Sequence, residues 1–147
     1  MAKNLKTIKF GENGETYAVN APVVSVNEEL TEAGTNIDFG SFEDGLTEVE
    51  VAVKGVAEAS GDYFFITING KQSGFITFAE IYTSTSTIRI KKVGSLWTVI
   101  SNITATTFMP YILSLLDGVD KITSISLQAY SEATPFAIGT QYALEGR

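Results

Sequence analysis

Short runs in which apolar and polar residues alternate dominate this chain. In the clearest run, Leu46–Lys54, Val49, Val51 and Val53 occupy every second position, with mainly charged residues between them. Successive side chains of a β-strand point to opposite faces, so this spacing predicts a strand that is buried on one side. Similar runs recur along the chain and are separated by turn-forming residues such as Asn69-Gly70, which predicts an all-β protein.

The number of these runs indicates the architecture. About eight strands are expected after residue 36, which suits a jelly-roll-like antiparallel β-sandwich. The strand expected over Leu96–Ile100 is apolar on both faces, so we predict that it lies centrally in its sheet. Pro110–Leu116 instead has apolar residues at helical spacing and precedes Asp117-Gly118, which predicts a short helix in one loop.

The N-terminal part of the chain has a pattern of its own. Residues 8–19 alternate on either side of Asn13-Gly14, which predicts a β-hairpin. Asn27–Thr35 is polar and acidic and contains a glycine, so a linker is expected there. These patterns predict an N-terminal β arm over residues 1–26, a linker over 27–35 and the β-sandwich over 36–147.

The composition removes several kinds of reaction chemistry. The 147 residues include no histidine and no cysteine, so a Ser-His-Asp triad, a thiol nucleophile and the commonest metal ligands are excluded. The sequence has neither a phosphate-binding loop nor a dinucleotide-binding fingerprint. We therefore expect no enzymatic activity, no cofactor and no metal.

Charged residues point to few kinds of ligand. The formal net charge of −7 argues against binding to nucleic acid, although cations cluster at Lys3, Lys6 and Lys9 and again at Arg89–Lys92. An acidic group could offer oxygen ligands to calcium but lacks an ordered ligand spacing, so a solvated loop is the preferred interpretation. Its members are Glu28, Glu29, Glu32, Glu43 and Asp44.

No run of the sequence reaches the roughly 20 apolar residues that cross a bilayer, and the start MAKNLKTIKF lacks the apolar segment of a secretory signal. We therefore expect no contact with a membrane.

Aromatic residues are the candidate binding residues. Tyr63, Phe65, Tyr82 and Tyr130 lie opposite the expected core face of a strand or beside a loop, so they could stack on a sugar ring. A second sheet or subunit packed on the same face is the more ordinary interpretation. Trp97, the single tryptophan, has apolar neighbours and is expected in the core rather than in a sugar site.

The C-terminal sequence carries a family resemblance. The segments Ile122-Thr123-Ser124-Ile125-Ser126-Leu127 and Phe136–Arg147, the latter with Gly139-Thr140, resemble the end of a jelly-roll module of bacteriophage virion proteins. Residues 86–99 are similar to the paired middle strands of such modules. The resemblance covers about the last two-thirds of the chain and lacks the family's N-terminal fibre or coiled-coil segment.

This resemblance implies a structural protein of the virion, assembled in the host cytoplasm, that serves as capsid decoration, head fibre or tail appendage. It also implies a homo-oligomer, with a trimer favoured, whose partners are other virion proteins. The N-terminal arm is the candidate attachment segment, since an arm can add strands to a neighbour's sheet edge. Its candidate residues are Lys6, Lys9, Phe10 and Tyr17.

Two other functions stay open at this stage. The alternative is a carbohydrate-binding module that recognises a glycan on the host surface. A hydrolase that uses two carboxylates is the third hypothesis, because any two acidic residues can meet in space. None of the acidic residues lies in a recognisable catalytic motif.

Overall fold

A computed structural model describes residues 5–10, 15–20, 23–55, 63–72, 76–77, 85–102, 108–129, 132 and 135–147. In β1, β2 and β8, and at residues 63, 108 and 109, only the course of the backbone is described.

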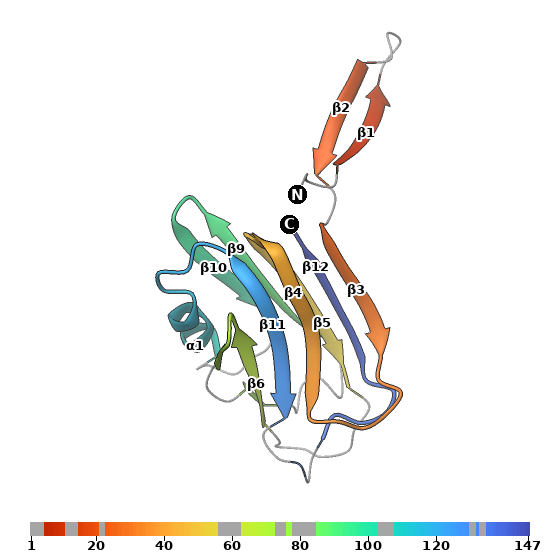
Figure 1. The fold of residues 1–147 in the computed structure, drawn as a ribbon, viewed down its shortest axis with the longest axis vertical. Coiled ribbons are helices and arrows are strands. Elements are labelled where there is room, and N and C mark those ends of the chain that lie inside the picture. The colour runs from red at the N-terminus through yellow and green to blue at the C-terminus, as the bar shows by residue number, and fades with distance from the viewer. Residues whose placement is uncertain are drawn as a thin grey trace.

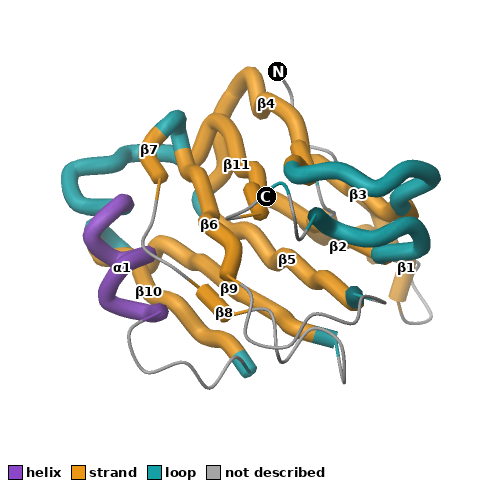
Figure 2. The backbone as a smooth tube through the Cα atoms, turned by 90° about the horizontal axis from the view of Figure 1, so that it is seen from below, coloured by secondary structure: helices purple, strands orange, loops and turns teal. Residues whose placement is uncertain are grey.

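Two sheets pack face to face (Figures 1 and 2). In spatial order, the first sheet contains β10 (Leu96–Ser101), β9 (Ser86–Val93), β5 (Glu48–Lys54), β12 (Gln141–Gly146) and β3 (Val24–Glu29). The second sheet contains β4 (Asn36–Leu46), β11 (Ile122–Ala129), β6 (Tyr63–Ile68) and β7 (Lys71–Gln72), and β8 (Ile76–Thr77) also pairs with β6. Every strand pair that the structure describes is antiparallel, so the predicted all-β sandwich is confirmed.

The strand order is that of a jelly roll. From β3 to β6, each strand lies in the sheet opposite to that of the strand before it. The two last strands then insert between earlier ones: β11 lies between β4 and β6, and β12 lies between β3 and β5. The late strands therefore lie inside the sheets, each beside an early strand, β3 or β4, at the sheet edge.

The core lies between the sheets, where the alternating pattern places it. Val49, Val51 and Val53 of β5 are buried, and their neighbours on the strand are not. In the facing sheet, Phe64, Ile66 and Ile68 of β6 are also buried. The predicted inward face of β5 is therefore confirmed, and β6 follows the same alternation.

Glycine and asparagine allow the tight turns. Asn69 and Gly70 both have positive φ, 51° and 78°, as a two-residue turn between β6 and β7 requires. Gly94, with φ of 61°, opens the two-residue turn between β9 and β10. The turn at Asn69-Gly70 was expected from the sequence.

The predicted helix is present as α1 (Phe108–Leu115). Pro110 lies in its first turn, where a missing N–H costs no helical hydrogen bond, and Gly118 has a φ of 71° just beyond its end. Ile112, Leu115 and Leu116 are buried in the core. The segment is thus more than a connection, because it closes the side of the sandwich next to β10 (Figure 2).

The N-terminal segment forms the expected hairpin. β1 (Leu5–Phe10) pairs with β2 (Glu15–Asn20) as a separate two-stranded sheet. Figure 1 shows this hairpin extending away from the end of the sandwich where β3 begins.

The linker expected over residues 27–35 is partly strand. β3 covers Val24–Glu29 and pairs along its whole length with β12, so the loop prediction for Asn27–Glu29 is wrong. An edge strand needs burial on one face only, and Val24 and Val26 suffice for it. The polar residues that follow Val26 therefore led to the wrong prediction of a loop.

Candidate interaction surface

Five large apolar side chains are exposed at one side of the sandwich, on the β9–β10 hairpin and on α1. Leu96 is 71% exposed and Ile100 is 65% exposed. We call the set the β10–α1 apolar surface, and its members are Val93, Leu96, Ile100, Tyr111 and Leu113. Ile138, in the loop before β12, is a sixth exposed apolar residue.

The position of β10 explains why these residues are exposed. We expected a central strand because the run is apolar on both faces, but β10 is the last strand of its sheet, and the prediction is wrong. Trp97 and Val99 pack against the core, whereas Leu96, Thr98 and Ile100 occupy the opposite face and are exposed. The apolar residues on that outer face therefore do not pack against the core.

A hollow of about 430 Å³ lies between the β9–β10 turn and the C-terminal end of α1. Its lining includes Leu96 and Trp97 from the hairpin, Leu113 from α1 and Val119 from the segment that follows. The hollow thus joins the strand and helix parts of the apolar surface.

Trp97 lines this hollow, and its half-buried side chain also packs against the core. Its position is therefore intermediate between the two interpretations of the sequence, a core residue and an exposed sugar site. Its indole Nε1 donates a hydrogen bond to the carbonyl oxygen of Val119 at 2.8 Å. The ammonium of Lys92 lies 5.5 Å from the centre of the ring. Both contacts orient the ring, so Trp97 acts as a fixed wall of the hollow.

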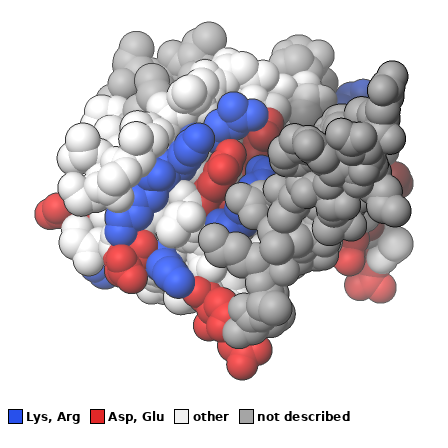
Figure 3. All heavy atoms as spheres, turned by 90° about the horizontal axis from the view of Figure 1, so that it is seen from above, with Lys and Arg blue, Asp and Glu red and all other residues white. Residues whose placement is uncertain are grey.

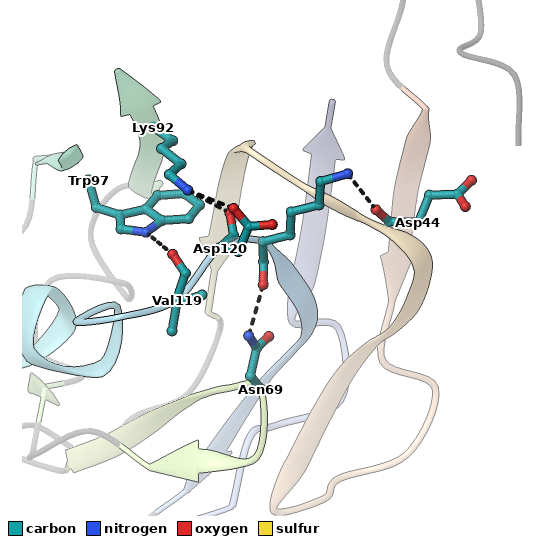
Figure 4. A network of polar contacts seen from close by, with 7 residues as sticks. Asp44, Asn69, Lys92, Trp97, Val119 and Asp120 are labelled. Carbon is teal, nitrogen blue, oxygen red and sulfur yellow. Dashed lines mark hydrogen bonds and ion pairs between the residues drawn. The ribbon is translucent and has the colours of Figure 1, made fainter. Parts of the chain in front are cut away.

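Polar contacts hold the segment that follows α1 (Figure 4). Lys92 Nζ donates to the carbonyl oxygen of Asp120 at 3.0 Å and to its carboxylate at 3.1 Å. The Lys92 side chain is 17% exposed and that of Asp120 is 89% exposed, so solvent weakens the ion pair. Lys121 extends from the same segment, and its Nζ donates to the carbonyl oxygen of Asp44 at 3.3 Å.

Asn69 anchors the β6–β7 turn to the start of β11. Its amide nitrogen donates to the carbonyl oxygen of Lys121 at 3.0 Å, as Figure 4 shows. Its Oδ1 accepts from the backbone N–H groups of Thr123 and Ser124 and from the Thr123 hydroxyl. These hydrogen bonds tie the β6–β7 turn to the chain a few residues beyond Val119, which lines the hollow.

One of the four candidate aromatic residues has a described side chain. Phe65 is half-buried on the outer face of the second sheet, opposite Gln128 of β11. Gln72 Nε2 donates to Gln128 Oε1 at 3.3 Å beside it. The backbone of Tyr63 lies in β6, whereas its side chain and residues Tyr82 and Tyr130 lie outside the described part of the chain. A role of these four aromatic residues in sugar binding stays a prediction.

The hairpin register arranges the candidate attachment residues. Lys6 lies opposite Val19, Phe10 opposite Glu15 and Tyr17 opposite Ile8, so Lys6, Phe10 and Tyr17 share one face of the hairpin. Lys9, at odd spacing from Lys6, belongs to the other face. The side chains of all four lie outside the described residues.

The basic cluster on β9 is balanced by acidic residues on β5. Arg89 forms an ion pair with Glu50 at 3.1 Å, and Lys91 lies opposite Glu48 in the register. Figure 3, which looks down on the end from which the hairpin extends, shows Lys and Arg side chains in a band beside Asp and Glu. This arrangement does not offer the uniform charge that a polyanion would require.

The acidic group considered for calcium is spread over the fold. Glu28 Oε2 accepts a hydrogen bond from the Tyr142 hydroxyl at 2.8 Å. This bond, burial and the Glu28 charge together raise the pKa of Tyr142 above 10.0. Within the described residues, no three acidic side chains lie close enough together to hold a metal ion.

Sequence reasoning missed Tyr111 and Leu113 as surface residues. The signal was that Phe108–Leu116 contains no charged residue on any side, although a helix on a surface normally has a polar face. An apolar helix with one face in the core leaves its other face for a partner or for solvent.

No helix among the described residues has the length and apolar character that a membrane-spanning helix requires. Compared with models of known protein families, with curated proteins and with solved structures, the chain matches none of them.

Proposed function

We propose that this chain is a non-enzymatic structural protein of a bacteriophage particle that binds other virion proteins, as capsid decoration, head fibre or tail appendage. The observation that carries an assembly role is the β10–α1 apolar surface, where Leu96, Ile100 and Leu113 are exposed around one wall of the sandwich. Contiguous exposed apolar side chains are typical of protein-binding surfaces.

The N-terminal hairpin supports the same role. A two-stranded hairpin that stands alone in water is marginally stable, and a third strand or a packing partner stabilises it. β1 and β2 pair with each other and form a sheet separate from the sandwich. We therefore assign the hairpin as the attachment arm, with its Lys6, Phe10 and Tyr17 face toward the particle.

The assignment to a phage particle rests on the resemblance of Ile122–Leu127 and Phe136–Arg147 to virion jelly-roll modules. The jelly-roll strand order supports it, because the two segments form β11 and β12 in the middle of the sheets. The homotrimer that the resemblance implies remains part of the proposal.

Incorporation into particles tests this function. The tagged chain is produced during phage growth, and its copy number in purified particles is measured by mass spectrometry. Deletion of residues 1–22 keeps every core residue that the structure describes and should abolish incorporation. The double variant Leu96→Lys/Ile100→Lys should lower the affinity of the chain for its virion partner at least about tenfold.

A matched control is Ser25→Lys, which adds a lysine to β3 at the opposite edge of the same sheet. It should leave the copy number unchanged. The proposal fails if the native chain is absent from purified particles, or if both the deletion and the double variant are incorporated at the native level.

One observation favours carbohydrate binding as a second candidate. Phe65 lies on the outer face of the second sheet among side chains that can hydrogen-bond sugar hydroxyls, because Gln128, Thr67 and Gln72 are its neighbours in the register. A flat apolar ring with amide and hydroxyl groups beside it is the combination that neutral sugars require.

Binding to immobilised host-surface glycans tests this second candidate. Phe65→Ala should weaken binding about tenfold if the ring stacks on a sugar. Ile138→Ala removes an exposed apolar residue from the loop before β12 and should have no effect. Absence of binding by a densely immobilised native chain would reject the glycan function.

A further inference from the structure

We propose that the outer edge of β10 pairs antiparallel with β10 of a second copy of this chain, about a two-fold axis at Thr98. This inference deepens the proposed function, on which it rests, by naming one partner for the β10–α1 apolar surface. It joins the first sheets of two copies into one continuous ten-stranded sheet, since each has five strands.

The first argument is that β10 is an edge strand of its sheet, with α1 packed near it and no further strand beside it among the described residues. β9 pairs with one side of β10, and within the described residues no strand pairs with the other side. The strand Leu96–Ser101 contains no charged residue and no proline. Sheet edges that stay in water normally carry such residues, since an uncharged edge pairs readily with another strand.

The second argument is that β10 is complementary to itself. In an antiparallel pair centred on Thr98, Leu96 lies opposite Ile100 of the second copy, and Trp97 lies opposite Val99. A two-fold contact requires this kind of reciprocity. Residues directly opposite each other in an antiparallel pair have their side chains on the same face, so the two-fold axis has to pass between two copies of one residue. If that residue were Trp97 or Val99, Leu96 or Ile100 would have no apolar partner.

The third argument is electrostatic. The basic residues nearest to the edge, Arg89, Lys91 and Lys92, lie on β9, one strand further in. Three strand spacings would separate the two β9 strands, roughly 14 Å. This exceeds the screening length of about 8 Å at physiological ionic strength. Arg89 is also paired with Glu50, so repulsion between the copies is small.

A cysteine at the proposed axis tests the pairing directly. The native chain contains no cysteine, so Thr98→Cys creates a single thiol in each copy. Directly opposed residues have Cβ atoms about 4.5–5.5 Å apart, close to the separation that a disulfide needs. Mild oxidation should therefore convert most of this variant to a covalent dimer, seen on a non-reducing gel.

The matched control is Ser25→Cys, an exposed position on β3 at the far edge of the same sheet. It should stay largely monomeric under the same oxidation. Equal cross-linking at both positions would overturn the proposal, because it would show random collision.

A second variant measures the non-covalent contact. Thr98→Lys places two ammonium groups opposite each other at the axis, so sedimentation should show half the native mass, with Ser25→Lys unchanged. A trimer that also used this contact would form a hexamer of two rings, and Thr98→Lys would again halve its mass. Tryptophan fluorescence checks folding, since Trp97 is the single tryptophan.

The outcomes separate this inference from the proposed function. A native chain that does not self-associate, or a Thr98→Lys variant with the native mass, overturns the β10 pairing. Incorporation of that monomeric chain into particles would leave the virion function standing. Self-association without incorporation would support the pairing and reject the virion function.

Discussion

The indole Nε1 of Trp97 donates a hydrogen bond to the carbonyl oxygen of Val119 at 2.8 Å, which joins the edge strand β10 to the segment that follows α1. The two residues are 22 positions apart in the sequence. This bond fixes one wall of the hollow beneath the β10–α1 apolar surface. The shape of the surface therefore depends on a contact between the strand and the helical connection.

Trp97→Phe removes this bond and keeps an aromatic ring in place. The free energy of unfolding should fall by about 1–2 kcal/mol, because the Val119 carbonyl loses its partner and part of the ring contact is lost. Urea unfolding followed by circular dichroism measures the change. Asp120→Asn is the control: its side chain is 89% exposed, so the stability should change by less than about 0.5 kcal/mol.

The sequence was sufficient where a strand has one buried and one exposed face. Val49, Val51 and Val53 gave β5 and its inward face, because burial on one side produces strict alternation. Asn69-Gly70 gave a turn because few other residue pairs tolerate positive φ at both positions. These features depend on neighbours along the chain.

The order of strands depends on contacts between distant residues, and there the sequence misled. β10 is apolar on both faces, a pattern typical of a central strand, but it lies at an edge with its outer face exposed. β3 is half polar and was expected to be partly a loop, although β12 pairs with all six of its residues. The candidate surface was missed for the same reason, since it needs β10 and α1 side by side.

Asn69 combines a positive φ with side-chain hydrogen bonds, and two variants separate these contributions. Asn69→Gly keeps the turn conformation and loses the bonds to Lys121, Thr123 and Ser124, so stability should fall by about 1–2 kcal/mol. Asn69→Ala should cost about 1 kcal/mol more, because alanine resists positive φ. Urea unfolding measures both, and equal losses would show that conformation contributes nothing.

Ile66 is fully buried on β6, between the two sheets. Ile66→Ala should lower the free energy of unfolding by about 2–5 kcal/mol, because it removes apolar contacts and leaves a cavity. Thr67→Ala, on the outer face of the same strand, should cost less than about 1 kcal/mol. Thermal unfolding of both variants checks the assignment of inner and outer faces, and a larger loss for Thr67→Ala would contradict it.

Tyr142 makes the stability depend on pH in the alkaline range. Its hydrogen bond to Glu28 raises the pKa of the folded state above 10.0, with smaller contributions from burial and from the Glu28 charge. The unfolded tyrosine ionises first as the pH rises, so the contribution of Tyr142 is full below about pH 10 and is lost as the pH rises toward the folded pKa. Urea unfolding on both sides of pH 10 should therefore show a smaller alkaline loss of stability for Tyr142→Phe than for the native chain. Glu28→Ala should reduce the loss as well, because it removes the hydrogen bond and the charge together. An unchanged alkaline loss in both variants would show that another group is responsible.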